Sequence, residues 1–214
     1  NRNNSKEFAQ ITARVMAANG IKVFLFKELR PTPELSYAVR YFGCDAGVML
    51  TASHNPKDYN GYKAYWNDGG QLVSPHDTLV IEKVMKITDY SQVKIQENLD
   101  NITIIEKSFD DIYLEEVLKL SLSPQIIKKH SDIKICYTPL HGTGITLVPK
   151  ALEMYGFKNI NIVSQQAIID GNFPSCKSPN PEEHSAMELG IKLAKEIDAD
   201  ILLATDPDAD RVGI

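Results

Sequence analysis

Cysteine is scarce in this sequence, and the three that occur are scattered. Cys44, Cys136 and Cys176 form no C-x-x-C pair. An odd, dispersed set argues against a disulfide framework and for a reducing compartment. We therefore expect a cytoplasmic location, with the cysteines serving as small buried hydrophobic residues.

Other absences narrow the classes of partner. No apolar run has the length of a membrane span, so we expect no membrane partner. Acidic residues (28) outnumber basic ones (23), the formal net charge is −5 and there is no basic stripe, so we expect no nucleic-acid partner either. The chain begins at Asn1 without a methionine and stops at Ile214, just after an acidic cluster. We interpret it as an internal fragment of a longer protein.

Strand-like and helix-like segments alternate along the chain, which is typical of α/β folds. Apolar periodicity and capping signals, including a capping box at Asn4 and Glu7 and a cap at Asn180, predict helices at residues 4–19, 32–42, 74–87, 112–119, 144–155 and 181–197. Short apolar runs predict strands at residues 21–26, 46–51, 62–66, 71–73, 102–105, 133–137, 160–164 and 201–204, with a hairpin turn at 67–70. Residues 121–131 are interpreted as a polar connection.

The pattern restarts near residue 110, which predicts a domain boundary there. We expect two successive three-layer α/β domains with mixed, mostly parallel sheets, one at residues 1–110 and the other at 111–214.

A polar loop, TASHNP at residues 51–56, follows the predicted strand 46–51. Ligands in open α/β sheets bind beyond the carboxyl ends of strands, so Ser53 is a candidate reactive hydroxyl. His54 could orient or deprotonate it, and Lys63 could bring positive charge to a phosphoryl group or transfer a proton. The alternative is an ordinary polar turn. No G-x-S-x-G pentapeptide occurs, which disfavours an α/β-hydrolase.

A second loop, DPDADR at residues 206–211, follows the predicted strand 201–204. Three carboxylates at alternate positions repel one another, and a hard divalent cation such as Mg²⁺ would neutralise them. The alternatives are a solvated acidic turn and an EF-hand, but an EF-hand needs glycine where Arg211 stands. An arginine beside a metal suits a phosphate, so metal, arginine and serine together indicate phosphoryl transfer.

A third polar loop, residues 138–144, follows the predicted strand 133–137 and carries three potentially useful residues. Gly142 and Gly144 precede a helix and could let an anion approach closely. His141 is a candidate for substrate binding, the alternative being a tight strand-to-helix turn.

The stretch TASHNPKDYNGYK (residues 51–63) and the hexapeptide DPDADR, in this order and at this separation, closely resemble the α-D-phosphohexomutases, the phosphoglucomutase/phosphomannomutase family. Residues 2–5, 31–33 and 68–71 are similar as well, so the resemblance covers essentially the whole chain. It implies an enzyme of four domains around one cleft. This chain would supply most of the first domain and the second domain up to the metal loop.

The resemblance also implies roles for individual residues. Ser53 would carry the phosphate of the resting enzyme, His54 would assist at the same loop, and Lys63 would be the general acid/base. Arg211 would steady the phosphoserine or the substrate. One Mg²⁺ would be bound by the oxygens of three carboxylates and of the phosphoserine, namely Asp206, Asp208, Asp210 and Ser53.

The activity implied is reversible intramolecular phosphoryl transfer between hexose 1-phosphate and hexose 6-phosphate, through a bisphosphorylated sugar. A glucose 1,6-bisphosphate-type activator would prime Ser53, and a small phosphosugar would be the partner. Tyr62 favours glucose or mannose phosphates over glucosamine phosphate, and phosphopentomutase and phosphoglucosamine mutase are the alternatives within the family. A non-catalytic module that binds Mg²⁺ and phosphosugar is the alternative of another class. We expect these 214 residues alone to be inactive, because the family's sugar-selecting and distal phosphate-binding domains are absent from them.

Overall fold

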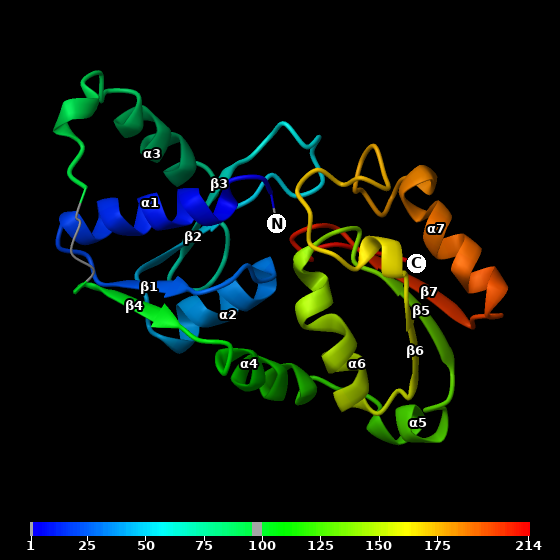
Figure 1. The fold of residues 1–214 in the computed structure, drawn as a ribbon. Coiled ribbons are helices and arrows are strands. Elements are labelled where there is room, and N and C mark those ends of the chain that lie inside the picture. Colours follow the sequence, from blue (N-terminus) through cyan, green and yellow to red (C-terminus); the bar gives the residue numbers. More distant parts are fainter. Residues whose placement is uncertain (1, 96–99) are drawn as a thin grey trace.

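A computed structural model describes residues 2–95 and 100–214 and has the predicted mixed α/β class (Figure 1). The helices are α1 (Ser5–Ala18), α2 (Thr32–Tyr41), α3 (His76–Val84), α4 (Phe109–Leu118), α5 (Pro124–Lys129), α6 (Val148–Tyr155) and α7 (His184–Glu196), with 3₁₀ turns η1 (Tyr90–Gln92), η2 (Thr143–Thr146) and η3 (Ser164–Gln166). The strands are β1 (Val23–Phe26), β2 (Ala46–Leu50), β3 (Tyr62–Trp66), β4 (Ile102–Ile105), β5 (Lys134–Thr138), β6 (Asn159–Ile162), β7 (Ile201–Thr205) and β8 (Val212–Gly213).

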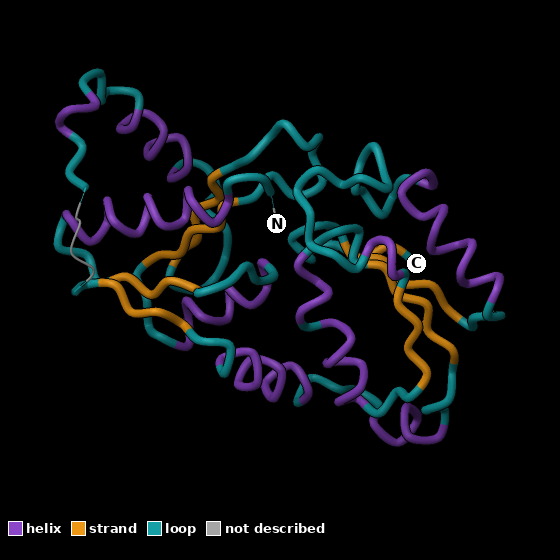
Figure 2. The backbone as a smooth tube through the Cα atoms, in the orientation of Figure 1, coloured by secondary structure: helices purple, strands orange, loops and turns teal. Residues whose placement is uncertain are grey.

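The strands fall into two groups, one in each half of the chain (Figure 2). In the first half, β1 pairs with β4 in parallel and β2 pairs with β3 antiparallel, so that Ala46 lies opposite Trp66. The predicted hairpin turn follows β3. Gly69 adopts a φ of +80° in it, and the Trp66 N–H donates to the carbonyl of Gly70. Only glycine takes that φ without strain.

The second half contains one four-stranded sheet in the order β6-β5-β7-β8. The first three strands are parallel, β8 is antiparallel, and α6 and α7 lie on opposite sides of the sheet (Figure 1). α7 packs against β5 and β7 through a core that includes Leu140, Met187 and Ala204. Because β5 and β7 are adjacent and parallel, the loops that follow them emerge at the same edge of the sheet.

Several local predictions were wrong at the ends of elements. Asn4 precedes α1 in a left-handed conformation (φ 64°) and makes no capping hydrogen bond through its side chain, so the predicted capping box is absent. Helix α7 begins at His184 rather than near 181, because the Asn180 side chain accepts from the N–H of Glu182 in a separate turn. Helix α5 forms where a polar connection was expected, and β8 was not anticipated.

Helix α4 connects the two halves. Its Phe109 ring packs in the aromatic cluster of the first half, with its centroid 5.2 Å from that of Phe42 and 5.3 Å from that of Tyr41. From the second half, Tyr155 of α6 donates a hydrogen bond to the carbonyl of Val117 at 2.8 Å. The helix therefore fixes how α2 and α6 lie relative to each other.

A buried charged cluster lies beside this helix. Glu34 of α2 is fully buried, and neither of its carboxylate oxygens receives a hydrogen bond from the described residues. Arg30 lies 3.8 Å from Glu34 and donates to Asp110 at 2.7 Å. Burial, followed by the negative charge of Asp110, raises the pKa of Glu34 to about 8, against the attraction of Arg30. The folded chain thus holds Glu34 protonated at neutral pH.

Replacing Glu34 with glutamine should therefore stabilise the chain at high pH and leave it unchanged at low pH. Between the ordinary pKa and the raised one, the folded state keeps a proton that the unfolded state releases, so wild-type stability falls as pH rises through this window. We expect Glu34→Gln to gain about 4 kcal/mol over wild type at pH 8 and almost nothing at pH 4. Urea denaturation at both pH values measures it. Glu28→Gln, which removes the exposed partner of Arg30, is the matched control and should show no such pH-dependent gain.

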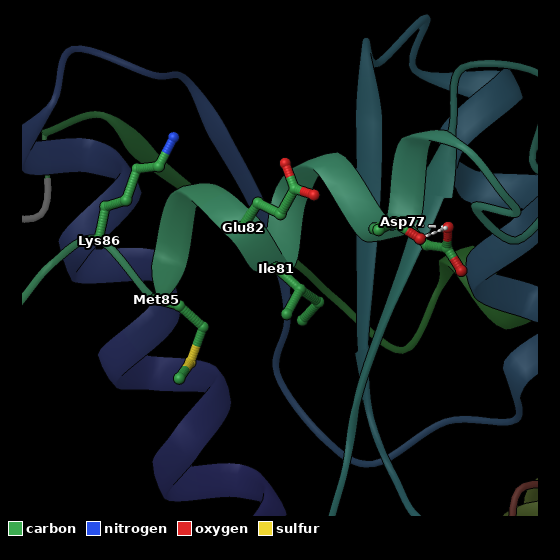
Figure 3. A pocket seen from close by; sticks show the side chains of 6 residues that line it. Asp77, Ile81, Glu82, Met85 and Lys86 are labelled. Carbon is green, nitrogen blue, oxygen red and sulfur yellow. Dashed lines mark hydrogen bonds between the residues drawn. The ribbon is translucent and has the colours of Figure 1, made fainter.

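Helix α3 stands apart from this core. None of its residues is buried, and several apolar side chains on and after it are exposed. An open hollow along the helix is shown in Figure 3, and it is lined by Asp77, Thr78, Ile81, Glu82, Met85 and Lys86. None of the residues predicted to act chemically lies in it. Among the described residues, no helix is both long enough and apolar enough to cross a bilayer.

Candidate functional site

The Ser53 loop follows β2, and its two ends, at Thr51 and Gly61, lie close together. The Thr51 N–H donates to the carbonyl of Gly61 at 3.1 Å, and a Cβ on Gly61 would lie only 2.5 Å from the Thr51 oxygen. Inside the loop, Ser53 takes a left-handed φ of 51°, and its N–H donates to the Thr51 hydroxyl at 3.0 Å. Left-handed backbone is uncommon for a residue other than glycine and clusters at functional sites.

The loop of three aspartates follows β7. Asp206 and Asp208 are buried, whereas Asp210 is more exposed, and one oxygen from each lies within 4.8 Å of the others. Asp206 Oδ1 accepts from the N–H groups of Asp210 (3.2 Å) and Arg211 (3.1 Å), so the loop is wrapped around its own first carboxylate. This turn requires Ala209 at a φ of 55°, a conformation that a larger β-branched side chain would disfavour.

The two loops meet between the halves. Ser53 Oγ donates to Asp206 Oδ2 at 2.7 Å, although 153 positions separate them in the sequence. His54 Nδ1 lies 3.2 Å from Ser53 Oγ and 3.9 Å from Asp206. From β3, Lys63 Nζ pairs with Asp208 at 3.0 Å and with Asp210 at 3.3 Å. The structure therefore brings six of the eight predicted residues together, the three aspartates with Ser53, His54 and Lys63.

The charges in this cluster compete. Burial and the charge of Asp208 raise the pKa of Asp206 to about 7. Burial acts the same way on Asp208, but Lys63 outweighs it and lowers the pKa of that carboxyl. For Lys63, burial by itself lowers the pKa, and the combined attraction of Asp208 and Asp210 overcomes it and raises the pKa. One lysine thus offsets only part of the negative charge of three carboxylates.

The donor set fits a hard divalent cation. Asp208 Oδ1 is buried and has no hydrogen-bond partner among the described residues, which is costly for a carboxylate oxygen. Oxygen-only ligands on a short rigid loop suit Mg²⁺. The residues that could hold it are Asp206, Asp208 and Asp210, with Ser53 beside them.

Thr32, at the start of α2, was missed by the sequence analysis. Its N–H donates to the main-chain carbonyl of Asp208 at 2.8 Å, and its hydroxyl donates to Asp208 Oδ2 at 3.1 Å. The sequence analysis places Thr32 at a helix start and in the family-like stretch 31–33 but assigns it no role, because its partner lies 176 positions away. Thr143, which follows β5, supports the same loop by donating from N–H and hydroxyl to the carbonyl of Pro207.

Comparison with known proteins identifies the relationship. Residues 1–91 match the family model described as phosphoglucomutase/phosphomannomutase, alpha/beta/alpha domain I, and residues 111–214 match domain II of the same family. This chain belongs to the phosphoglucomutase/phosphomannomutase family. The resemblance stated from the two loops is therefore confirmed.

Relatives within the family agree in sequence and fold. Phosphoglucomutase of Staphylococcus haemolyticus is 41% identical over 98% of this chain, and that of Staphylococcus aureus strain MRSA252 is 43% identical over 98%. A solved Thermus thermophilus structure, provisionally assigned as a phosphomannomutase, superposes with a TM-score of 0.76 at 26% identity, covering 99% of this chain and 45% of its own. The chain spans 38% of the length of these two phosphoglucomutases.

The side chains of two residues that the sequence analysis assigned to the site, Arg211 and His141, lie apart from the cluster. Arg211 directs its guanidinium to Glu182 at 3.4 Å on the surface, with nearly half of its side chain exposed. His141 is 2% exposed, and its ring nitrogens contact the Ile168 carbonyl (3.0 Å) and the Ser175 hydroxyl (2.8 Å). In this structure His141 therefore braces the loop after β6, and Arg211 meets the cluster only through its backbone N–H and carbonyl, whereas its side chain points away.

Proposed function

We propose that this chain is the phosphoserine- and metal-carrying part of a phosphohexomutase, an enzyme that interconverts hexose 1-phosphate and hexose 6-phosphate. The observation that supports it best is the hydrogen bond from Ser53 Oγ to Asp206, which joins the two loops across the halves. The names of the Staphylococcus relatives support an intramolecular phosphotransferase. We assign the two domains to residues 1–110 and 111–214, in keeping with the two family matches.

The chain's own residues have distinct parts in this proposal. Ser53 Oγ carries the phosphoryl group and passes it to a sugar hydroxyl, whose proton leaves for a nearby base. The other phosphate of the bisphosphorylated sugar then returns to Ser53, and the sugar oxygen that it leaves takes up a proton, so atoms and charge balance over the cycle. His54, 3.2 Å from Ser53 Oγ, is placed to take the proton of the free hydroxyl. Lys63, kept protonated by Asp208 and Asp210, is placed to donate positive charge or a proton to the phosphoryl oxygens.

We assign Asp206, Asp208 and Asp210 as the ligands of one Mg²⁺, with an oxygen of phosphorylated Ser53 completing the set. When bound, the ion offsets the negative charge of the phosphoryl group during transfer. Arg211 and His141 remain candidates to contact phosphoserine and substrate respectively, and for Arg211 this requires release of Glu182.

The substrate is a small phosphosugar, with glucose or mannose phosphates favoured and pentose and glucosamine phosphates as the alternatives. A glucose 1,6-bisphosphate-type activator primes Ser53. The enzyme works in the cytoplasm, in keeping with three free cysteines. These 214 residues alone are inactive in the complete isomerisation, because they span only 38% of the length of the phosphoglucomutases they match and the family resemblance puts the sugar-selecting and distal phosphate-binding domains in the rest.

The test is label exchange in a chimera in which these residues replace the matching segment of Staphylococcus haemolyticus phosphoglucomutase. After incubation with glucose 1,6-bisphosphate labelled in its phosphates, we expect peptide mass spectrometry to find label on Ser53. A module that only binds phosphosugar would take up no covalent label, and a folded, unlabelled chimera would contradict the proposal.

A further inference from the structure

The Arg2 side chain lies inside the Ser53 loop. It is 3% exposed, and its guanidinium donates to the backbone carbonyls of Ser53 (3.2 Å), Asn55 (2.8 Å) and Tyr59 (3.0 Å), and to that of Pro56. Four carbonyls from a seven-residue stretch thus converge on one cation. The planar fork of five N–H donors makes this possible, whereas a lysine ammonium has only three donors at a point.

The loop has little else to hold its shape. Its recorded backbone hydrogen bonds inside residues 52–59 run from Asn55 to Ala52 and from Tyr59 to Pro56, and most of its side chains are exposed. A buried guanidinium with several charge-assisted hydrogen bonds is worth more than either of these neutral turns. The conformation that presents Ser53 therefore depends on Arg2.

The same end of the chain also touches the second half. The Arg2 guanidinium carbon lies 4.9 Å from the ring centroid of Phe173, a buried residue in the long loop before α7. Next to it, Asn3 donates to Asn172 at 3.0 Å. A Cβ on Gly171 would lie 2.5 Å from the Asn3 nitrogen, so the two segments approach as closely as glycine allows. Arg2 is therefore held between the Ser53 loop and the loop at residues 170–173.

We propose that Arg2 is a positioning residue that, clamped against Phe173, sets the Ser53 loop in place over the aspartate loop. It acts through the loop backbone, and among the described residues its guanidinium donates no hydrogen bond to Ser53 Oγ or to the carboxylates. The proposal rests on the proposed function, since it assigns Arg2 to the alignment of phosphoserine with the metal ligands. Its consequence is that phosphate on Ser53 strengthens Mg²⁺ binding only when Arg2 is present.

The experiment uses the 214-residue chain in two forms, with serine or with co-translationally installed phosphoserine at position 53. Calorimetry measures Mg²⁺ affinity for each form, and hydrogen exchange measures protection of the Ser53, Asn55 and Tyr59 amides. We expect phosphorylation to raise Mg²⁺ affinity at least about tenfold in wild type and less than about twofold in Arg2→Lys. Exchange at the three amides should rise about tenfold in Arg2→Lys, while the amides of β5 stay protected.

Two further variants sharpen the result. Phe173→Leu keeps apolar volume but removes the aromatic face, so it should lose part of the gain in affinity, and it serves as the test if Arg2→Lys does not fold. Arg40→Lys makes the same chemical change on the exposed side of α2 and should behave as wild type.

The outcomes separate the two proposals. If Arg2→Lys and Phe173→Leu keep both the full affinity gain and the protected amides, the positioning role is overturned. If phosphorylation gives no gain in wild type, while Arg2→Lys still loosens the loop, the clamp stands and the proposed function fails.

Discussion

Ser53→Ala is expected to abolish incorporation of phosphate from a labelled sugar bisphosphate and to remove all measurable mutase turnover in the chimera. The reason is that no other hydroxyl among the described residues is recorded in hydrogen-bond contact with Asp206. In the proposed mechanism this hydroxyl accepts the phosphoryl group, so its removal would eliminate the covalent step rather than slow it. Peptide mass spectrometry and a coupled assay of hexose 6-phosphate formation measure the two losses.

The matched control for this variant is Ser36→Ala. Like the Ser53 hydroxyl, the Ser36 hydroxyl donates one hydrogen bond, in its case to the Gly69 carbonyl at 2.7 Å, but it lies at the hairpin turn away from the aspartates. Each variant should lose about 1 kcal/mol of stability from one hydrogen bond, and only Ser53→Ala should lose exchange. Label elsewhere in the Ser53→Ala chain, with turnover retained, would contradict the assignment of Ser53.

Asp208→Asn is expected to weaken Mg²⁺ binding by about 100-fold, because it removes a full charge from the buried part of the carboxylate cluster. Substituting Lys63, the partner of Asp208, should have the opposite effect on Mg²⁺ affinity. Lys63→Gln removes the cation that competes for Asp208 and Asp210, so we expect Mg²⁺ to bind about tenfold more tightly. Isothermal titration of the 214-residue chain with Mg²⁺ measures both.

Asp198→Asn is the control for this pair, since Asp198 is fully exposed at the far end of α7 and carries the same charge. It should leave the affinity within a factor of about two, because exposed charges at a distance are screened by salt. Equal losses in Asp198→Asn and Asp208→Asn would mean that the ion responds to net charge rather than to a built site. Weaker binding in Lys63→Gln would mean that the lysine supports the site instead of competing with the ion.

A helix or strand could be predicted from the sequence where residues close to it in the chain determine its ends. Strand β4 matches its prediction at both ends, because its apolar run is short and sharply bounded. Helix α7 was misplaced at its start, because the Asn180 side chain made a turn of its own instead of capping the helix. Strand β8 has only two residues and exists because β7 offers it a partner, so no local pattern could announce it.

The chemistry of the site was readable where the residue types were unusual for their position. Three aspartates after an apolar strand and a serine-histidine pair after another indicated both loops without knowledge of the fold. Thr32 and Arg2 carried no such signal, because a threonine at a helix start and an arginine in a polar stretch before a helix are ordinary.

The sequence by itself determined the alternation of strands and helices, the candidate reactive residues and the strands that each loop follows, because these depend on neighbours a few positions apart. Only the tertiary structure decided which groups face one another. Thr32 meets Asp208 across 176 positions, Ser53 meets Asp206 across 153, and Arg30 meets Asp110 across 80. These pairs form because helix α4 and the loop at residues 170–173 fix how the halves pack. Burial at that junction strengthens each hydrogen bond and each interaction between charges.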